Sequence, residues 1–353
     1  MDVLRGLAIF FVLMNHVNMR LRMAKVPYTH GLPAQLVSSL VWNGQQGVQI
    51  FFAVSGFLIT TTALRRWGPR VDIGGFYRLR FARIAPLLLL LLAVLSVLDL
   101  AHVDNFVINP KASTLPRALL AALTFHVNVL EARHGYLPAN WDILWSLSVE
   151  EMFYLVFPLV RRYTGLFIGL LVACVVLGPI SRMHGNAVWR EYSYLGGMDA
   201  IALGCLTALL VSRIRLRPRI LAAAGTALLI FTLCFSLTAN RLGGFEMTIL
   251  GIGTCLIIAA SAQTEWTAPR MLRPLTSLGQ RSYEVYLTHM FVVFACFQVF
   301  LNTGKQMRAV PLLFIASILI SALLGEAVAR VYSEPMNRNL RKEQPRPTLL
   351  RAK

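Results

Sequence analysis

The stretch Ile84–His102, which reads IAPLLLLLLAVLSVLDLAH, indicates the class of fold to which this chain belongs. Asp99 is its only charged residue, and a helix of about 20 apolar residues spans the hydrocarbon core of a bilayer. Similar runs recur along all 353 residues, of which 56% are hydrophobic and 14% charged. Soluble domains carry about 25% charged residues. The sequence therefore predicts an all-α, polytopic membrane protein.

The apolar runs predict membrane-spanning helices over residues 3–19, 46–64, 84–102, 143–160, 164–181, 196–212, 219–238, 245–262, 282–301 and 311–332. These ten spans form one membrane domain over residues 1–335, and we expect a basic cytoplasmic tail over residues 336–353. A further run, at about 115–130, is less apolar because it contains Thr124 and His126. We expect it to form a re-entrant or interfacial helix.

The distribution of basic residues supports this count. Arginine and lysine collect on the cytoplasmic side of membrane helices. With ten crossings and a cytoplasmic N-terminus, the basic segments within 65–83, 213–219 and 338–353 all fall on that side. A full crossing at 115–130 would send the later segments outside. We therefore expect both termini in the cytoplasm, and topology explains the net charge of +18 better than nucleic-acid binding does.

The first span carries ionisable residues, which cost about 2.5–3.5 kcal/mol each inside a membrane and are therefore candidates for function. Arg5 and His16 are eleven residues apart, almost three helical turns, and so share a face. Asp2 precedes Arg5 by three residues and can pair with it. We expect Arg5 at the cytoplasmic rim and His16 near mid-membrane. An anchoring role for Arg5 and a structural hydrogen bond for His16 remain alternatives.

Arginines also follow the second span. Arg80 and Arg83 share a helical face at the entrance of the third span, and Arg78 precedes them. Guanidinium groups bind phosphate oxygens through paired hydrogen bonds, so this cluster suits a polyphosphate. Membrane topology and contacts with lipid head groups explain the same residues equally well.

The fourth span holds two adjacent carboxylates, Glu150 and Glu151. Neighbouring helical side chains diverge by about 100°, so we expect different partners for them. One carboxylate, such as Glu150, is expected to orient His16, and the other to hold a cation such as Arg5. In the ninth span, His289 suits a structural hydrogen bond as well as a functional role. The five cysteines lack metal-ligand spacing, and we expect no metal.

Five motifs in this order resemble those of the acyltransferase-3 family of bacterial integral-membrane O-acyltransferases. They are Asp2-x-x-Arg5-Gly6 with His16, Gly47-Val48-x-x-Phe51-Phe52-x-x-Ser55-Gly56-Phe57, Arg80-x-x-Arg83-Ile84-x-Pro86, Trp145-Ser146-Leu147-Ser148-Val149-Glu150-Glu151, and Ser282-Tyr283-x-x-Tyr286-Leu287-x-His289. The resemblance covers nearly the whole chain. It implies a location in the bacterial inner membrane and transfer of an acyl group, expected to be acetyl, from acyl-CoA to a hydroxyl of a carbohydrate or glycosylated acceptor of the cell envelope.

Together, the residues and the resemblance predict three groups of site residues. The catalytic candidates are His16, Glu150, Arg5 and Asp2. The candidates for binding acetyl-CoA are Arg78, Arg80, Arg83, Ser55 and Tyr77. Further candidates are Glu151, Tyr286, His289 and Trp145.

We expect the donor phosphates on Arg80 and Arg83, with the pantetheine arm running along the first span towards His16. His16 then acts as a general base or takes the acyl group itself. A proton-coupled transporter or an acyl-group translocator is the alternative, since buried Glu, His and Arg also serve transport. The acceptor, the acyl chain length and the oligomeric state are not determined by the sequence.

Overall fold

The computed structural model describes residues 1–68, 71–235, 238, 242–264 and 268–341, and every regular element in these residues is helical. The ten long helices are α1 (Asp2–Met23), α3 (Gly44–Trp67), α4 (Ile73–Leu100), α8 (Leu144–Val160), α9 (Thr164–Met183), α11 (Tyr194–Val211), α12 (Pro218–Cys234), α14 (Phe245–Ala262), α16 (Ser282–Asn302) and α17 (Val310–Val328). Each predicted span coincides with one of them. The all-α prediction is confirmed, although the end of the predicted span 219–238 lies partly outside the described residues.

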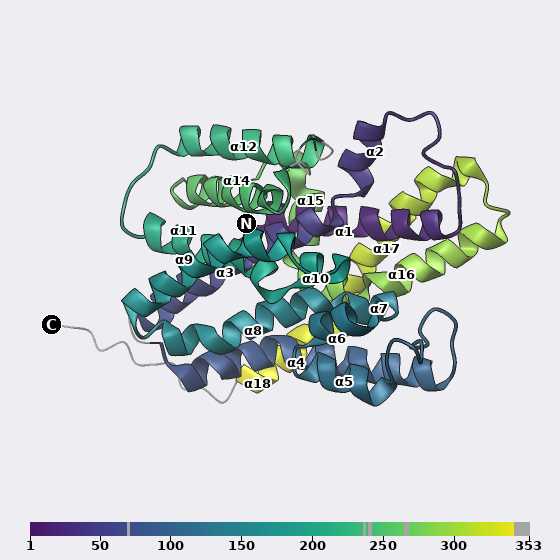
Figure 1. Cartoon of the computed structure of the whole chain (residues 1–353), viewed down its shortest axis with the longest axis horizontal. Coiled ribbons are helices and arrows are strands. Elements are labelled where there is room, and N and C mark those ends of the chain that lie inside the picture. Colours follow the sequence, from purple (N-terminus) through teal and green to yellow (C-terminus); the bar gives the residue numbers. More distant parts are fainter. Residues whose placement is uncertain (69–70, 236–237, 239–241, 265–267, 342–353) are drawn as a thin grey trace.

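Eight helical segments among the described residues are long and apolar enough to cross a membrane. The two remaining long helices, α1 and α12, do not meet both requirements of length and apolar character. Helix α12 has 17 residues, and α1 carries charged residues in its first and last turns. Both lie among the other long helices, which run across the view in Figure 1.

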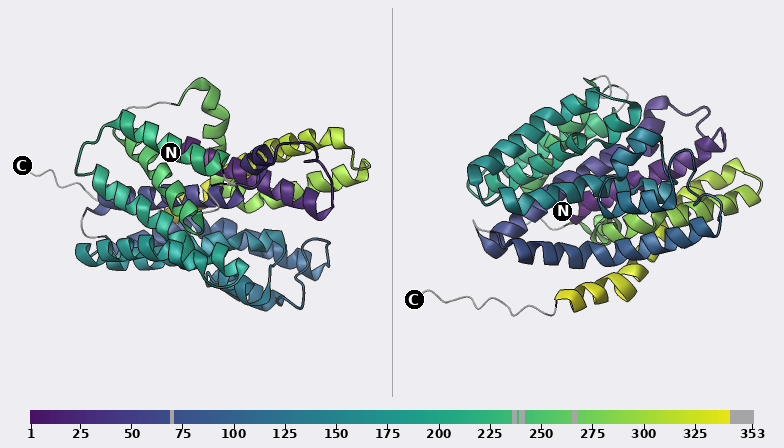
Figure 2. Two further views of the ribbon diagram at one scale, coloured as in Figure 1. Left: turned by 45° about the horizontal axis from the view of Figure 1, so that its top comes forward. Right: turned by 60° about the horizontal axis from the view of Figure 1, so that its bottom comes forward.

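The short helices fill the connections between the long ones. They are α2 (Ala34–Val41), α5 (Leu115–Leu123), α6 (Val127–His134), α7 (Ala139–Asp142), α10 (Ala187–Tyr192), α15 (Arg273–Gln280) and α18 (Glu334–Arg341). Turns of 3-10 helix cover Arg270–Leu272 and Met307–Ala309, and a π-helical turn at Ala329–Ser333 joins α17 to α18. Helix α18 lies beside α4 (Figure 2). Most of the predicted tail, residues 342–353, lies outside the described residues.

The run at 115–130 does not cross the membrane, as predicted, but the expectation of a single helix is wrong. It forms α5 and the start of α6, and the chain breaks between them at Phe125, whose φ is 58°. The nine residues of α5 extend about 14 Å at the standard rise, less than half of a bilayer core.

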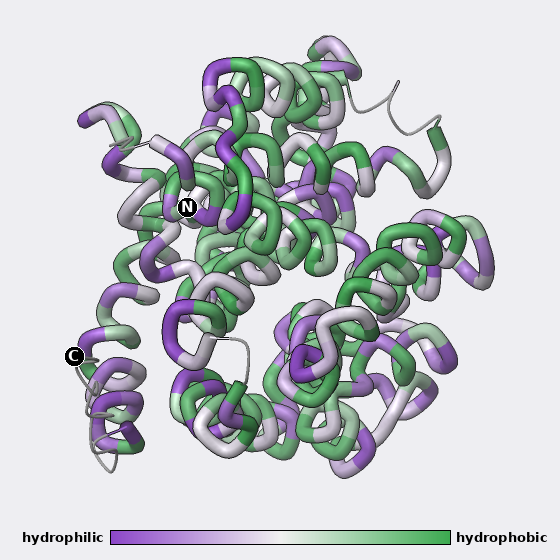
Figure 3. Tube along the Cα trace, turned by 90° about the vertical axis from the view of Figure 1, so that its left-hand side faces the viewer, coloured by the Kyte–Doolittle hydropathy of each residue, from purple (hydrophilic) through white to green (hydrophobic). Residues whose placement is uncertain are grey.

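Close helix contacts depend on glycine. A Cβ on Gly56 of α3 would lie 2.0 Å from the carbonyl oxygen of Ile201 in α11. On the other helix of this contact, a Cβ on Gly204 of α11 would lie 2.1 Å from the carbonyl oxygen of Ala53 in α3. Small residues allow backbones to approach in membranes, where no hydrophobic force drives helices together. Hydrophobic residues, green in Figure 3, dominate many of the helices.

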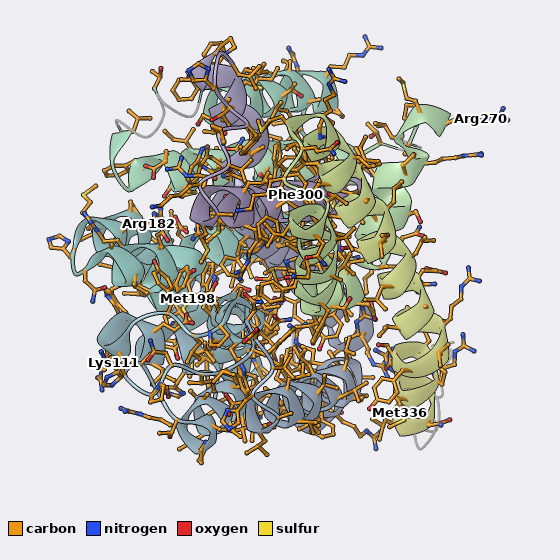
Figure 4. The ribbon with its side chains drawn as sticks, turned by 90° about the vertical axis from the view of Figure 1, so that its right-hand side faces the viewer. Lys111, Arg182, Met198, Arg270, Phe300 and Met336 are labelled. Atoms are coloured by element: carbon orange, nitrogen blue, oxygen red, sulfur yellow. The ribbon has the colours of Figure 1, made fainter. Side chains whose placement is uncertain are left out.

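A buried ion pair ties together three helices at one end of the bundle. Arg182, at the end of α9, donates hydrogen bonds to Asp199 of α11 at 2.7 and 3.1 Å and to Thr248 of α14 at 2.6 Å. Asp199 is fully buried. Figure 4 labels Arg182 close to Met198, the neighbour of Asp199. These contacts give Asp199 a structural role.

Candidate active site

A central cavity of about 380 Å³ opens among α1, α3, α4, α8 and α16. Its polar lining includes Arg5, Ser55, Arg80, Arg83, Glu150 and Tyr286. Along α3 the lining extends from Val48 to Thr62, which corresponds to about 21 Å at the helical rise. The cavity is therefore elongated and runs along the helices.

Arg80 is the most strongly bound cation of the cavity. Its Nε and Nη2 donate to Glu151 Oε1 at 2.9 and 2.5 Å, and Nη2 also donates to Glu150 Oε1 at 3.0 Å. Its guanidinium carbon lies 3.8 Å from the ring centroid of Tyr154. Two carboxylates thus share one arginine, so the expectation that Glu150 and Glu151 have different partners is wrong.

Glu150 makes its other contact with Ser55, whose hydroxyl donates to Glu150 Oε1 and also contacts the hydroxyl of Tyr154. The expected contact of Glu150 with His16 is therefore wrong. Tyr154 was not predicted as a site residue. Its position four residues after Glu150 places both on one helical face, and this spacing is a signal that the sequence contained.

Arg5 and Arg83 are held more loosely than Arg80. The expected pairing of Arg5 with Asp2 is confirmed, with 3.4 Å between Arg5 Nη1 and Asp2 Oδ1. Arg83 Nη1 lies 3.6 Å from Oε1 of Glu284, a carboxylate that was also not predicted. Both separations exceed the 2.7–2.9 Å or so of a good charged hydrogen bond. These two guanidinium groups therefore retain donors for a ligand.

His16 contacts a second histidine instead of a carboxylate. His16 Nδ1 lies 2.9 Å from the carbonyl oxygen of Val12 and 3.2 Å from Nε2 of His289. His289 Nδ1 lies 2.6 Å from the carbonyl oxygen of Tyr286. Carbonyl oxygens only accept hydrogen bonds, so each Nδ1 carries the proton when both rings are neutral. Nε2 of His289 then accepts from His16, and Nε2 of His16 keeps a free lone pair.

Tyr286 connects the histidine pair with the cavity. Its ring lines the cavity and lies 5.8 Å, between centroids, from the ring of His289. Its hydroxyl donates to the carbonyl oxygen of Ile143 at 3.0 Å and lies 2.7 Å from the hydroxyl of Ser146. Tyr286 is thus fixed at the boundary between the cavity and the two imidazoles.

Comparison with known proteins identifies the family. The sequence model described as an acyltransferase domain, that of the acyltransferase-3 family, matches residues 1–326. The chain belongs to this family. The family is one of transferases, which favours the enzyme over the transporter.

Two relatives of this acyltransferase-3 protein come from Staphylococcus aureus. O-acetyltransferase OatA of strain NCTC 8325 / PS 47 is 26% identical over 382 residues, covering 96% of this chain and 57% of the relative. The putative O-acetyltransferase SACOL0978 of strain COL is 25% identical, covering 77% of this chain and 51% of the relative. The chain thus spans little more than half the length of these curated relatives. No solved structure matches the chain.

Seven predicted residues of this acyltransferase-3 chain are not part of the cavity lining. Asp2, Glu151, His16 and His289 contact lining residues or one another, as described above. The other three are Tyr77, Arg78 and Trp145. Tyr77 donates its hydroxyl to the carbonyl oxygen of Leu155, and Arg78 is exposed. Trp145 is buried and stacks on Tyr192 with centroids 4.2 Å apart. In the described structure, Tyr77 and Trp145 make packing contacts and Arg78 lies at the surface. The expected part of these three residues in the site stays a prediction.

The ion pair of Arg80 with Glu151 has a testable energetic consequence. Glu151 is almost buried, so Arg80→Met leaves it unpaired inside the bundle, whereas Glu151→Leu leaves Arg80 paired with Glu150. Breaking a buried pair costs about 3–5 kcal/mol, whereas replacing both partners by apolar residues costs far less. We expect Arg80→Met to unfold at a lower temperature in detergent than the double variant Arg80→Met, Glu151→Leu does. Additive losses in the double variant would contradict the pairing.

Proposed function

We propose that this chain transfers an acetyl group from acetyl-CoA to a hydroxyl of a carbohydrate or glycosylated acceptor. The observation that carries the proposal is the contact of His16 with His289, whose ring packs against Tyr286 in the wall of a cavity that also bears Arg5 and Arg83. Membership of the family supports acyl transfer. The names of the two relatives support acetyl as the group and oxygen as its destination.

The contacts refine the donor site. Arg80 is neutralised by two carboxylates, so we assign it to holding α4 against α8. The phosphates of the donor are assigned to Arg83 and Arg5, whose ion pairs are looser. The elongated shape of the cavity, about 21 Å along α3, suits the pantetheine arm. The arm places the thioester near Tyr286, within reach of the histidine pair.

The donor enters from the cytoplasm in this proposal. The cations of the cavity lie towards the helix ends that carry other basic residues. Arg65 and Arg66, in the last turn of α3, are examples of these other residues. Basic residues favour the cytoplasmic side, where the donor is made available. The same rule places both termini of the chain in the cytoplasm.

His16 acts as a general base in the transfer step. Its Nε2 takes the proton of the acceptor hydroxyl while the oxygen attacks the carbonyl carbon of the thioester. The carbon–sulfur bond breaks, and the thiolate of CoA leaves and takes the proton from the imidazolium. The ester and free CoA are the products, and His16 is neutral again. His289 is a positioning residue, since its Nε2 accepts from His16 Nδ1–H and keeps that proton away from Nε2.

His16→Ala is expected to reduce CoA release from acetyl-CoA to background because the base is removed. Donor binding should stay within about threefold of wild type, since the phosphate contacts lie elsewhere. Both are measured on purified protein in detergent, by thiol release and by equilibrium binding of radiolabelled acetyl-CoA. His184→Ala, which changes an exposed histidine at the end of α9, is the control and should behave as wild type. Wild-type turnover in His16→Ala would refute the mechanism.

Replacing His289 tests the assignment of protons in the histidine pair. His289→Phe removes one of the two acceptors for His16 Nδ1–H and leaves only the carbonyl oxygen of Val12. It is expected to lower kcat by about 100-fold, the lower range of general-base effects. KM for acetyl-CoA should not change. His289→Gln keeps an acceptor oxygen near the position of Nε2 and should recover part of kcat. Equal kcat values in the two variants would assign His289 to packing alone.

A further inference from the structure

A second cavity, which we call the vestibule, lies at the other end of α1. It has a volume of about 840 Å³ and is formed by residues of α1, α2, α3, α9, α10 and α14 and of the loops beside them. Arg22 lines the vestibule, whereas Arg5 lines the central cavity. Their separation of seventeen positions corresponds to about 26 Å along α1, close to the thickness of a bilayer core. The two cavities therefore belong to opposite sides of the membrane.

Two polar atoms in the vestibule have no partner within the described chain. Gln46 is only 7% exposed, and its Oε1 accepts no hydrogen bond. Oε2 of Glu246 is likewise inaccessible to water and unpartnered. Both residues line the vestibule. Buried oxygens nearly always accept a hydrogen bond in folded proteins, so these two suit a ligand that brings donors.

The remaining lining indicates what kind of ligand fits. The indole of Trp42 is 41% exposed, and the guanidinium carbon of Arg22 lies 4.7 Å from its centroid. Cations and carboxylates both occur, with Arg190 beside Glu191. This balance of charge disfavours a polyanion such as a nucleotide. An aromatic face together with hydrogen-bond donors and acceptors suits a neutral, hydroxyl-rich saccharide.

The vestibule and the central cavity reach the same level of α3, on different faces of that helix. Gln46 lines the vestibule, and Val48, two residues further on, lines the central cavity. A Cβ on Gly44, in the same turn as Gln46, would lie 2.5 Å from the side chain of Asn15. Because Asn15 directly precedes His16, the histidine lies at the level where the two cavities approach each other. His16 thus lies nearer to the Met23 end of α1 than the expected mid-membrane position.

We propose that the vestibule binds the acceptor, a neutral saccharide, and presents its hydroxyl to the acyl group from the membrane face opposite to the donor. Gln46 and Glu246 accept hydrogen bonds from saccharide hydroxyls, and Trp42 provides an apolar face for a sugar ring. This inference rests on the proposed function, because it assigns the second substrate of that reaction.

The test separates the two half-reactions. Trp42→Ala and Gln46→Leu are produced in cells that lack the native gene, and acetyl esters on envelope glycans are measured by alkaline release of acetate. The purified variants are also assayed for hydrolysis of acetyl-CoA without acceptor. We expect glycan acetylation to fall at least tenfold, with hydrolysis at the wild-type rate. Trp42 is largely accessible, so its replacement provides a variant that does not disturb a packed core.

Gln298→Leu is the matched control, since it makes the same change at an exposed site near the end of α16, away from the vestibule lining. It should retain both activities. Wild-type glycan acetylation in both vestibule variants would overturn the inference, as would an equal fall in hydrolysis and acetylation. If the wild-type chain itself neither hydrolyses acetyl-CoA nor acetylates glycans, the proposed function fails, and this result differs from either of the others.

Discussion

Charged side chains inside a bilayer must find partners within the protein, and this constraint organises the whole bundle. Arg80 satisfies it with Glu150 and Glu151, and Arg182 satisfies it with Asp199. Each cluster joins different helices, and both use the donors of one guanidinium group on several acceptors. The low dielectric constant around them strengthens each contact. The result is a rigid frame on which cavities persist between helices.

The histidine pair meets the same constraint differently. Two neutral imidazoles need no counter-charge, and two backbone carbonyls with one ring-to-ring hydrogen bond satisfy three of their four nitrogens. The fourth nitrogen, Nε2 of His16, has no hydrogen-bond partner among the described residues. A carboxylate partner would have introduced a charge beside it. The arrangement explains why Glu150, which was expected to orient His16, is used instead to neutralise Arg80.

Hydropathy and charge predicted the helices closely, because apolar length and the distribution of arginine are local properties. The pairing of Asp2 with Arg5 was also predictable, since it depends on spacing within one helix. The contact of His16 with His289 joins residues 273 positions apart. The helical periodicity of the sequence does not predict contacts between different helices. Arg80 appeared free for phosphate for the same reason: its partners lie on another helix. The vestibule is lined by residues from six helices and the loops beside them, so no single sequence motif marks it.

The central claim is that the donor and the acceptor reach His16 from opposite faces of the membrane. Inverted and right-side-out membrane vesicles from the same cells test it directly, because acetyl-CoA does not cross a bilayer. Radiolabelled acetyl-CoA is added to each, and label in the envelope glycan is measured, with the His16→Ala chain as background. The account predicts incorporation in inverted vesicles, whose cytoplasmic face is accessible, and background in right-side-out vesicles. Equal incorporation in both, or incorporation only in right-side-out vesicles, would contradict it.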